Sequence, residues 1–320
     1  MTQRANFLEL TRFGKPERIV SHIPEYSLYY QGCHHDDFEG HGHHSPVGTT
    51  WHDIWGTEWH KDLEGVMGFP RGFPLADLEN ALDNFKAPDI DDPKYCGLIY
   101  EQRKNFHGGD VFLTGSHRDT LWERGYMLVG MENLMMAFYT DPDLVKRLFH
   151  IIMDFQLKVA EHYVKAGAEI IYMGDDMGTQ NALLLGRPII EEFLVPEYKR
   201  LFDFYADKNV IIDFHSCGHI EEILDIFMDL GVDILNPLQS TANDLELIRK
   251  KTQGKMALQG GISSEILLRG DKEEIQNEVK NKIRILGSEG GYICGPDQSM
   301  PYTQESLDIM EDAIDQYGRF

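Results

Sequence analysis

The chain has 320 residues, of which 42% are hydrophobic and 26% charged, a composition typical of a soluble globular protein with one large domain or two small ones. Its net charge of −23 and its pI near 4.9 exclude nucleic acid and anionic membrane surfaces as expected partners, because both are bound through basic side chains. No apolar run approaches the roughly 18–20 residues needed to cross a bilayer, and four scattered cysteines are too few for a disulfide framework.

The first 46 residues show no helical or strand pattern, and we expect an irregular segment at 1–46 that precedes a barrel domain at 47–320. This segment lacks the apolar core of a signal peptide, which favours a cytoplasmic protein. It is rich in aromatic residues and histidines, with His34 and His35 followed by a second group at 41–44. Such a segment can be a solvated loop, a lid over a pocket or a metal site, and these interpretations stay open.

Residues 50–59 alternate bulky apolar and polar side chains and are expected to be extended, and a short amphipathic helix follows at 74–82. From about residue 92 strands and helices alternate. The expected elements are strands 98–100 and 111–113, helix 141–166, strand 169–173, a helix from 188, strand 209–215, helix 220–230, strand 233–237, helix 242–251, strand 256–261, helix 271–286, strand 291–294 and helix 303–317.

Repeated strand–helix units without a break in composition predict an α/β protein with a parallel sheet. Their number over one domain favours a (β/α)₈ TIM barrel over an open sheet. No Gly-x-Gly-x-x-Gly follows a strand, and no phosphate-binding Gly-x₄-Gly-Lys motif is present, which argues against nucleotide-binding folds.

The stretch 210–218 carries the clearest sign of chemistry. A β-branched apolar run ends there in His215-Ser-Cys217, and alternation along a strand places the imidazole and the thiol on one side. Both are zinc ligands, and the strand at 291–294 supplies Cys294 as a candidate third ligand. Three protein ligands leave a fourth position open, as in catalytic zinc sites. The alternative is two buried thiols beside a hydrogen-bonded histidine, with Asp213 either supporting the imidazole or facing the core.

Other polar residues also follow strands, at the end where barrel enzymes place their active sites. Asp175 and Asp176 are candidate catalytic acids or bases, or groups that orient a substrate. Asp53, between Trp51 and Trp55, is a candidate general acid. The alternative for the strand-end residues is helix capping or loop stabilisation. Candidate substrate-binding residues are Trp51, Tyr172, Gln180, Asn236, Gln239 and Gln259.

From Trp51 to its end the chain resembles the uroporphyrinogen decarboxylase superfamily, and most closely its zinc- and corrinoid-dependent methyltransferases. The segments that carry the resemblance are 53–59, 74–78, 123–128, 174–180, 214–219, 236–239 and 259–261, with the His215-x-Cys217 motif as the most specific part. In the methylcobalamin:coenzyme M members this motif and one later cysteine bind zinc. The resemblance therefore implies a (β/α)₈ barrel with His215, Cys217 and Cys294 as zinc ligands.

The resemblance also implies two directions of methyl transfer. Some members move a methyl group from a methylated corrinoid protein to a zinc-bound thiol, and others move it from a donor such as an aryl methyl ether to a cob(I)alamin protein. Decarboxylases of the superfamily carry an Arg-Gln-Ala-Gly-Arg-Tyr stretch near the start, whose arginines bind substrate carboxylates. Residues 31–35 stand there instead, so porphyrinogen decarboxylation is not expected.

The function we expect is a zinc-dependent methyltransferase that moves methyl between a small-molecule donor and a corrinoid protein. The chain has no room for a corrinoid domain, so methylcobalamin or cob(I)alamin would come with a partner protein. The aromatic residues Tyr29, Tyr30, Trp51 and Trp55 favour an aryl methyl ether as donor. The alternatives are methyl transfer from methylcobalamin to a thiol, a metal-free decarboxylase, and a tetrapyrrole- or corrinoid-binding chaperone without chemistry.

Overall fold

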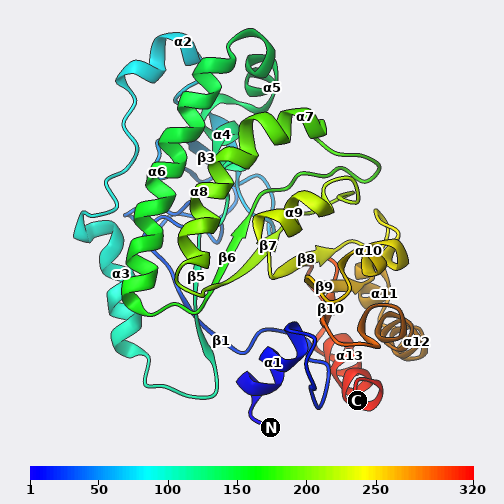
Figure 1. The fold of residues 1–320 in the computed structure, drawn as a ribbon. Coiled ribbons are helices and arrows are strands. Elements are labelled where there is room, and N and C mark those ends of the chain that lie inside the picture. Colours follow the sequence, from blue (N-terminus) through cyan, green and yellow to red (C-terminus); the bar gives the residue numbers. More distant parts are fainter.

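Seven parallel strands form the centre of the computed structural model, which describes residues 1–320 (Figure 1). Each strand pairs with the next in a single order along the sheet. The strands in that order are β1 (Glu25–Leu28), β5 (Phe112–Ser116), β6 (Ile170–Gly174), β7 (Ile211–His215), β8 (Ile234–Leu238), β9 (Ala257–Ile262) and β10 (Tyr292–Pro296).

A single bridge joins the two ends of this sheet. Val20, which precedes β1, pairs in parallel with Ile293 of β10 at the opposite edge. The sheet therefore curls into a barrel, and the predicted α/β class with a TIM-barrel arrangement is confirmed. The chain forms seven regular strands, and the isolated bridge at Val20 stands where an eighth would close the barrel.

Helices pack around the barrel, with α3, α6 and α8 on one side in Figure 1 and α10 to α13 on the other. The helices are α1 (Gln3–Thr11), α2 (Leu78–Ala81), α3 (Pro93–Asn105), α4 (Trp122–Val129), α5 (Met131–Thr140), α6 (Pro142–Ala166), α7 (Arg187–Ile189), α8 (Val195–Ala206), α9 (Leu224–Leu230), α10 (Leu245–Thr252), α11 (Ser264–Arg269), α12 (Lys272–Lys282) and α13 (Gln304–Tyr317). Short irregular helical turns are η1 (Leu82–Asn84), η2 (Ile190–Leu194) and η3 (Ile283–Gly287).

A second, antiparallel sheet of three short strands lies outside the barrel. It consists of β2 (Thr50–His52), β3 (Glu58–His60) and β4 (Phe69–Gly72). The expected extended segment at 50–59 thus contains two strands joined by a turn. Trp51 and Trp59 face each other across this pair and are buried, which explains the alternation of bulky side chains in the sequence.

Side chains alternate between two cores along the barrel strands. One side packs against the helices in a cluster of 68 buried residues, and the other side forms a small cluster of seven inside the barrel. The inner cluster consists of Phe7, Ile23, Phe112, Ile170, Ile234, Ala257 and Ile293. Most of these residues lie near the amino ends of their strands, so apolar side chains fill that end of the barrel and polar ones occupy the carboxyl end.

Two sequence predictions about local structure were wrong. Residues 98–100 lie within α3, where Asp92 caps the helix, Pro93 begins it and Tyr95, Cys96 and Ile99 are buried at helical spacing. A three-residue apolar run fits either element, so its periodicity could not decide. The segment 1–46, expected to be irregular, contains α1 and β1, and β1 belongs to the barrel sheet. No helix combines the length and apolar composition that crossing a bilayer would require.

Candidate metal centre

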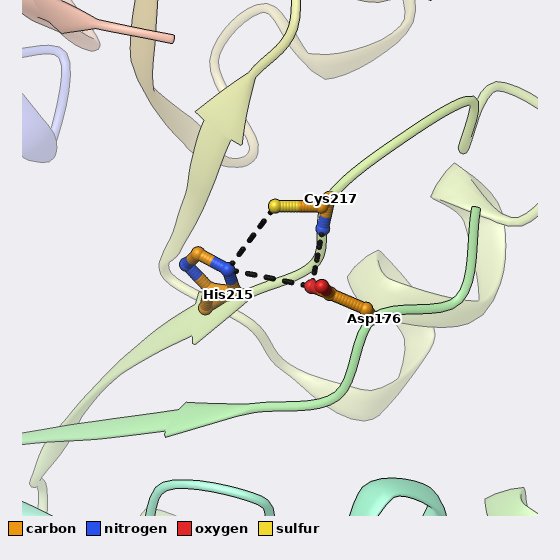
Figure 2. Close-up of side chains that lie close together, drawn as sticks. All are labelled: Asp176, His215 and Cys217. Carbon is orange, nitrogen blue, oxygen red and sulfur yellow. Dashed lines mark hydrogen bonds and ion pairs between the residues drawn. The ribbon is translucent and has the colours of Figure 1, made fainter. Parts of the chain in front are cut away.

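Three side chains of the types that ligate metals converge at the carboxyl ends of β6 and β7 (Figure 2). The ligand atoms of Asp176, His215 and Cys217 all lie within 4.8 Å of one another. His215 Nε2 is 3.4 Å from Cys217 Sγ and 3.4 Å from Asp176 Oδ1. The backbone N–H of Cys217 donates to Asp176 Oδ1 at 2.9 Å, which holds the carboxylate against the turn that carries the thiol.

Two glycines allow the loops that carry this cluster to touch. Gly218 has a φ of +84°, and a Cβ at this position would lie 2.3 Å from the backbone of Gly178. The two loops also exchange backbone hydrogen bonds, from Gly178 to Cys217 at 3.1 Å and from His219 to Thr179 at 2.7 Å. Glycine at 178 and 218 therefore brings the loop of Asp176 next to Cys217.

The orientation of His215 is set by a chain of amide and carboxylate groups. Its Nδ1 lies 3.0 Å from Asn236 Oδ1, and Asn236 Nδ2 in turn donates to Asp213. Because the amide oxygen can only accept, Nδ1 carries the hydrogen and Nε2 is directed at Cys217 and Asp176. Asp213 thus supports the imidazole through Asn236, and burial raises the pKa of Asp213 to about 7.

The cluster fits a divalent metal such as zinc. For zinc bonds of roughly 2.0–2.3 Å at tetrahedral angles, neighbouring ligand atoms lie about 3.3–3.8 Å apart. The two distances of 3.4 Å from His215 Nε2 match this spacing.

Burial alone would lower the pKa of His215, but hydrogen bonds to Asp176 and Cys217 raise it well above its usual value. Burial likewise opposes ionisation of Asp176, yet its hydrogen bonds to His215 and to the Cys217 amide lower its pKa, which keeps an anionic ligand in place.

Cys294, expected as the third ligand, lies elsewhere. Its neighbour Ile293 belongs to the cluster inside the barrel, so Cys294 has the opposite parity and packs in the outer layer against the helices. It is fully buried, and burial raises the pKa of its thiol to about 12, which disfavours the thiolate. The structure therefore brings Asp176, and not the expected Cys294, to His215 and Cys217.

Gln298, two residues beyond β10, approaches the same cluster. Its Nε2 lies 3.3 Å from Cys217 Sγ. Rotation of the side-chain amide would present its oxygen instead, because the two ends of the group are similar in size. The last strand thus contributes an amide to the thiol rather than a second thiolate.

The cluster lies in a cavity of about 1080 Å³. Of the expected site residues, Tyr172, Asn236 and Gln259 line it, as do Asp176, His215 and Cys217. The ring of Tyr172 is 5.8 Å from that of His215, and the Gln259 side-chain oxygen is buried without a hydrogen-bond partner. Other lining residues include Tyr29, His34, Arg118, Asp119, Glu123, Met300 and Tyr302.

Asp175, expected to be catalytic, is turned away from this cavity. It is fully buried, and its carboxylate accepts hydrogen bonds from the backbone of Leu121 at 2.8 Å, from that of Glu123 at 2.7 Å and from the Tyr198 hydroxyl. It therefore anchors the start of α4, and burial raises its pKa to about 7.

Asp53, the other expected acid, is likewise part of the framework. Its Oδ1 accepts the backbone N–H groups of Trp55 and Thr57, and its Oδ2 accepts Trp59 Nε1 at 3.1 Å and Arg124 at 2.8 Å. Four donors saturate this buried carboxylate, and it does not line the cavity.

The remaining expected contacts with substrate also lie outside the cavity. Trp51 donates its indole N–H to the backbone of His35, Gln239 accepts the N–H of Gly218, and Gln180 is exposed near Thr241. Of the aromatic residues expected at the entrance, Tyr30, Trp51 and Trp55 are buried, and only Tyr29 lines the cavity.

Sequence reasoning missed Arg118, Asp119, Glu123 and Gln298. Arg118 and Asp119 follow β5, so the rule that functional residues follow barrel strands would have found them had the end of that strand been placed correctly. Glu123 lines the cavity, accepts the Tyr126 hydroxyl at 3.0 Å and has no cation partner. Burial, with the nearby carboxylates Asp119 and Asp176, raises its pKa well above the usual value.

The chain is similar to proteins of one family. A family model described as "Uroporphyrinogen decarboxylase (URO-D)" matches residues 108–316. The methylcobamide:CoM methyltransferase MtaA of Methanosarcina barkeri is 28% identical over 155 residues, which are 48% of this chain and 44% of MtaA. A uroporphyrinogen decarboxylase of Mannheimia succiniciproducens is 23% identical over 258 residues, which are 76% of this chain and 70% of that protein.

The match to MtaA thus spans less than half of that relative. Among solved structures, a methyltransferase from Methanosarcina mazei is similar to this chain with a TM-score of 0.73 and 17% sequence identity. The match covers 99% of this chain and 99% of that protein. At this level of identity the likeness shows a shared fold.

Proposed function

The chain belongs to the uroporphyrinogen decarboxylase family, and we propose that within this family it is a zinc-dependent methyltransferase that moves a methyl group between a small-molecule donor and a corrinoid protein. The observation that carries the proposal is the cluster of Asp176, His215 and Cys217 at the mouth of the barrel. One nitrogen, one sulfur and one oxygen ligand form a set that zinc accepts, and they leave a position open.

Zinc bound there would supply Lewis-acid polarisation of a methyl ether oxygen, or would hold a thiolate acceptor. The residues of the chain have separate tasks. Asp213 and Asn236 hold His215 in the tautomer that directs Nε2 at the metal position. Tyr29, Tyr172 and Tyr302 give the cavity aromatic walls that suit an aryl donor.

Demethylation of an ether releases an alcohol or phenol, and its oxygen must gain a proton as the methyl group passes to cobalt. Glu123 is the carboxyl group suited to hold that proton, because it lines the cavity and its raised pKa favours the protonated form. It takes the acid–base role that the sequence had suggested for Asp53, Asp175 and Asp176. The corrinoid would come with a separate protein that docks over the cavity.

Two other functions remain as alternatives. The likeness to a methylcobamide:CoM methyltransferase favours transfer from methylcobalamin to a thiol, which would use the same metal cluster. The likeness to a uroporphyrinogen decarboxylase, which spans more of the chain, favours a metal-free decarboxylase. Metal dependence separates the decarboxylase from both methyltransferases.

The test is methyl transfer to cob(I)alamin, followed by its visible absorption under anaerobic conditions. Zinc-loaded wild type is compared with His215→Ala, Cys217→Ala and the buried-thiol control Cys294→Ala. We expect transfer from a panel of aryl methyl ethers in wild type and in Cys294→Ala, and background rates in the other two variants. Full activity of Cys217→Ala, or activity that survives removal of zinc, would contradict the proposal.

A further inference from the structure

Arg118 is the sole lysine or arginine among the residues that line the cavity. The chain carries 30 lysine and arginine residues against 53 acidic ones, and the cavity has the same balance, with one guanidinium among five carboxyl groups. Its side chain is 31% exposed, at the wall that the main cavity shares with a neighbouring cavity of about 510 Å³. The position of this charge indicates which kind of ligand the cavity takes.

The backbone at this position is strained. Arg118 and Asp119 have φ values of +32° and +34°, which side chains other than glycine rarely adopt. Such strain persists only where the surroundings enforce it, and it is concentrated at functional sites. Here His117 N–H donates to Tyr172 O at 2.9 Å and Thr120 N–H donates to Gly174 O at 2.8 Å, so both sides of the strained pair are tied to β6.

The adjacent carboxylate forms an ion pair with Arg118 but no hydrogen bond. Asp119 Oδ1 is 3.9 Å from the guanidinium, beyond hydrogen-bond distance. The other oxygen of Asp119, Oδ2, is hydrogen-bonded to the buried His35. Arg124 Nη2 lies 3.7 Å from the same Oδ2. Asp119 is therefore shared among several positive or donating groups.

The hydrogen-bond directions around His35 explain why Asp119 stays in this position. Gly68 N–H donates to His43 Nδ1 at 2.9 Å, so His43 carries its hydrogen on Nε2 and donates to His35 Nδ1 at 2.9 Å. His35 must then donate from Nε2 to Asp119. The histidine-rich segment thereby fixes the carboxylate with neutral imidazoles, and burial lowers the pKa of both histidines.

Arg118 makes one hydrogen bond, from Nη1 to His34 Nδ1 at 3.1 Å. A guanidinium has five N–H donors, so most of them have no protein partner. The other acidic groups of the cavity are engaged elsewhere: Glu25 with Thr114, Asp213 with Asn236, Asp176 with Cys217, and Glu123 with the Tyr126 hydroxyl. A planar fork of free donors in a partly buried cavity is complementary to a carboxylate.

We propose that Arg118 binds the anionic group of the small-molecule substrate, so that the cavity selects aromatic methyl donors that carry a carboxylate. This inference rests on the proposed function for the reaction, although ligand binding can be measured without it. The carboxylate lies against Arg118 and the aromatic walls hold the ring. The methyl-bearing oxygen then points to Asp176, His215 and Cys217 across the same cavity.

The test is calorimetric titration of the zinc-loaded protein with three matched probes: 4-methoxybenzoate, its neutral analogue 4-methoxybenzamide and the cationic 4-methoxybenzylamine. Wild type is compared with Arg118→Gln, Arg118→Lys and the control Arg284→Gln, which changes an exposed arginine bonded to Asn281. We expect wild type to bind the benzoate about 10- to 100-fold more tightly than the benzamide, as a charged hydrogen bond implies.

Arg118→Gln should remove that preference, Arg118→Lys should keep part of it, and Arg284→Gln should keep all of it. The wild-type comparison needs no variant, so it stands even if Arg118→Gln fails to fold. Equal or undetectable binding of the benzoate and the benzamide to wild type, tightest binding of the amine, or an undiminished preference in Arg118→Gln would overturn the inference. An Arg118-dependent preference without methyl transfer would refute the proposed function alone.

Discussion

Replacement of Asp53 by alanine separates a framework role from a catalytic one. The Asp53 and Arg124 side chains are 0% and 3% exposed and 2.8 Å apart. Removal of the carboxylate would leave the guanidinium buried without its main partner. It would also free two backbone N–H groups, of Trp55 and Thr57, and the indole N–H of Trp59.

Breaking a buried ion pair from one side costs about 3–5 kcal/mol. At about 2.1 cal/mol/K per residue, unfolding of a chain of this length carries an entropy of roughly 0.67 kcal/mol/K. The melting temperature of Asp53→Ala should therefore fall by about 5–7 °C. The matched control is Asp62→Ala, which breaks an exposed pair with Arg71 and should cost under about 1 kcal/mol.

The assay combines calorimetric unfolding with zinc content and methyl transfer at a temperature where both variants are folded. We expect Asp53→Ala to bind zinc and to transfer methyl at close to the wild-type rate once folded. An unchanged melting temperature together with lost activity would refute this reasoning and return Asp53 to the catalytic site.

Three further predictions follow from the structure. Asn236→Leu removes the acceptor for the hydrogen on His215 Nδ1 and should weaken zinc binding about 10- to 100-fold. A competition titration with a chelator measures this affinity, and an unchanged affinity would contradict the role of Asn236 in orienting His215. Gly218→Ala places a Cβ 2.3 Å from the backbone of Gly178, so the two loops must separate and the zinc content should fall. The control is Gly231→Ala, which has a similar φ and open space around the added Cβ, and it should retain zinc. Burial lowers the pKa of His117 to about 4, so the unfolded chain binds a proton before the folded chain does as the pH falls. The free energy of unfolding, measured with urea, should therefore fall by about 3 kcal/mol between pH 6.5 and pH 4. The His117→Asn variant should lose less stability over the same pH range.

The sequence was informative where one local pattern decides the outcome. Alternation of strands and helices predicts the barrel, and a strand ending in His215-x-Cys217 predicts the adjacent imidazole and thiol. Cys294 shows the limit of this reasoning. Ile293 and Cys294 are both apolar enough to be buried, so the sequence does not say which of them faces the inside of the barrel.

Long-range partners were equally hidden from the sequence. The role of Asp53 depends on Arg124, which is 71 residues away, and the role of Asp175 depends on the start of α4 and on Tyr198. The position of Asp176 beside Cys217 depends on the close approach of two glycine-containing loops. These features arise from packing between distant segments, which residue patterns do not encode.

The most direct test of the account is zinc content per chain, measured by plasma mass spectrometry after zinc loading and removal of loosely bound metal. Wild type and Cys294→Ala should each retain about one zinc, and Cys217→Ala, His215→Ala and Asp176→Ala should lose it, because the last three change the converging ligands. Zinc lost from Cys294→Ala but retained by Asp176→Ala, or no zinc in wild type, would contradict the account.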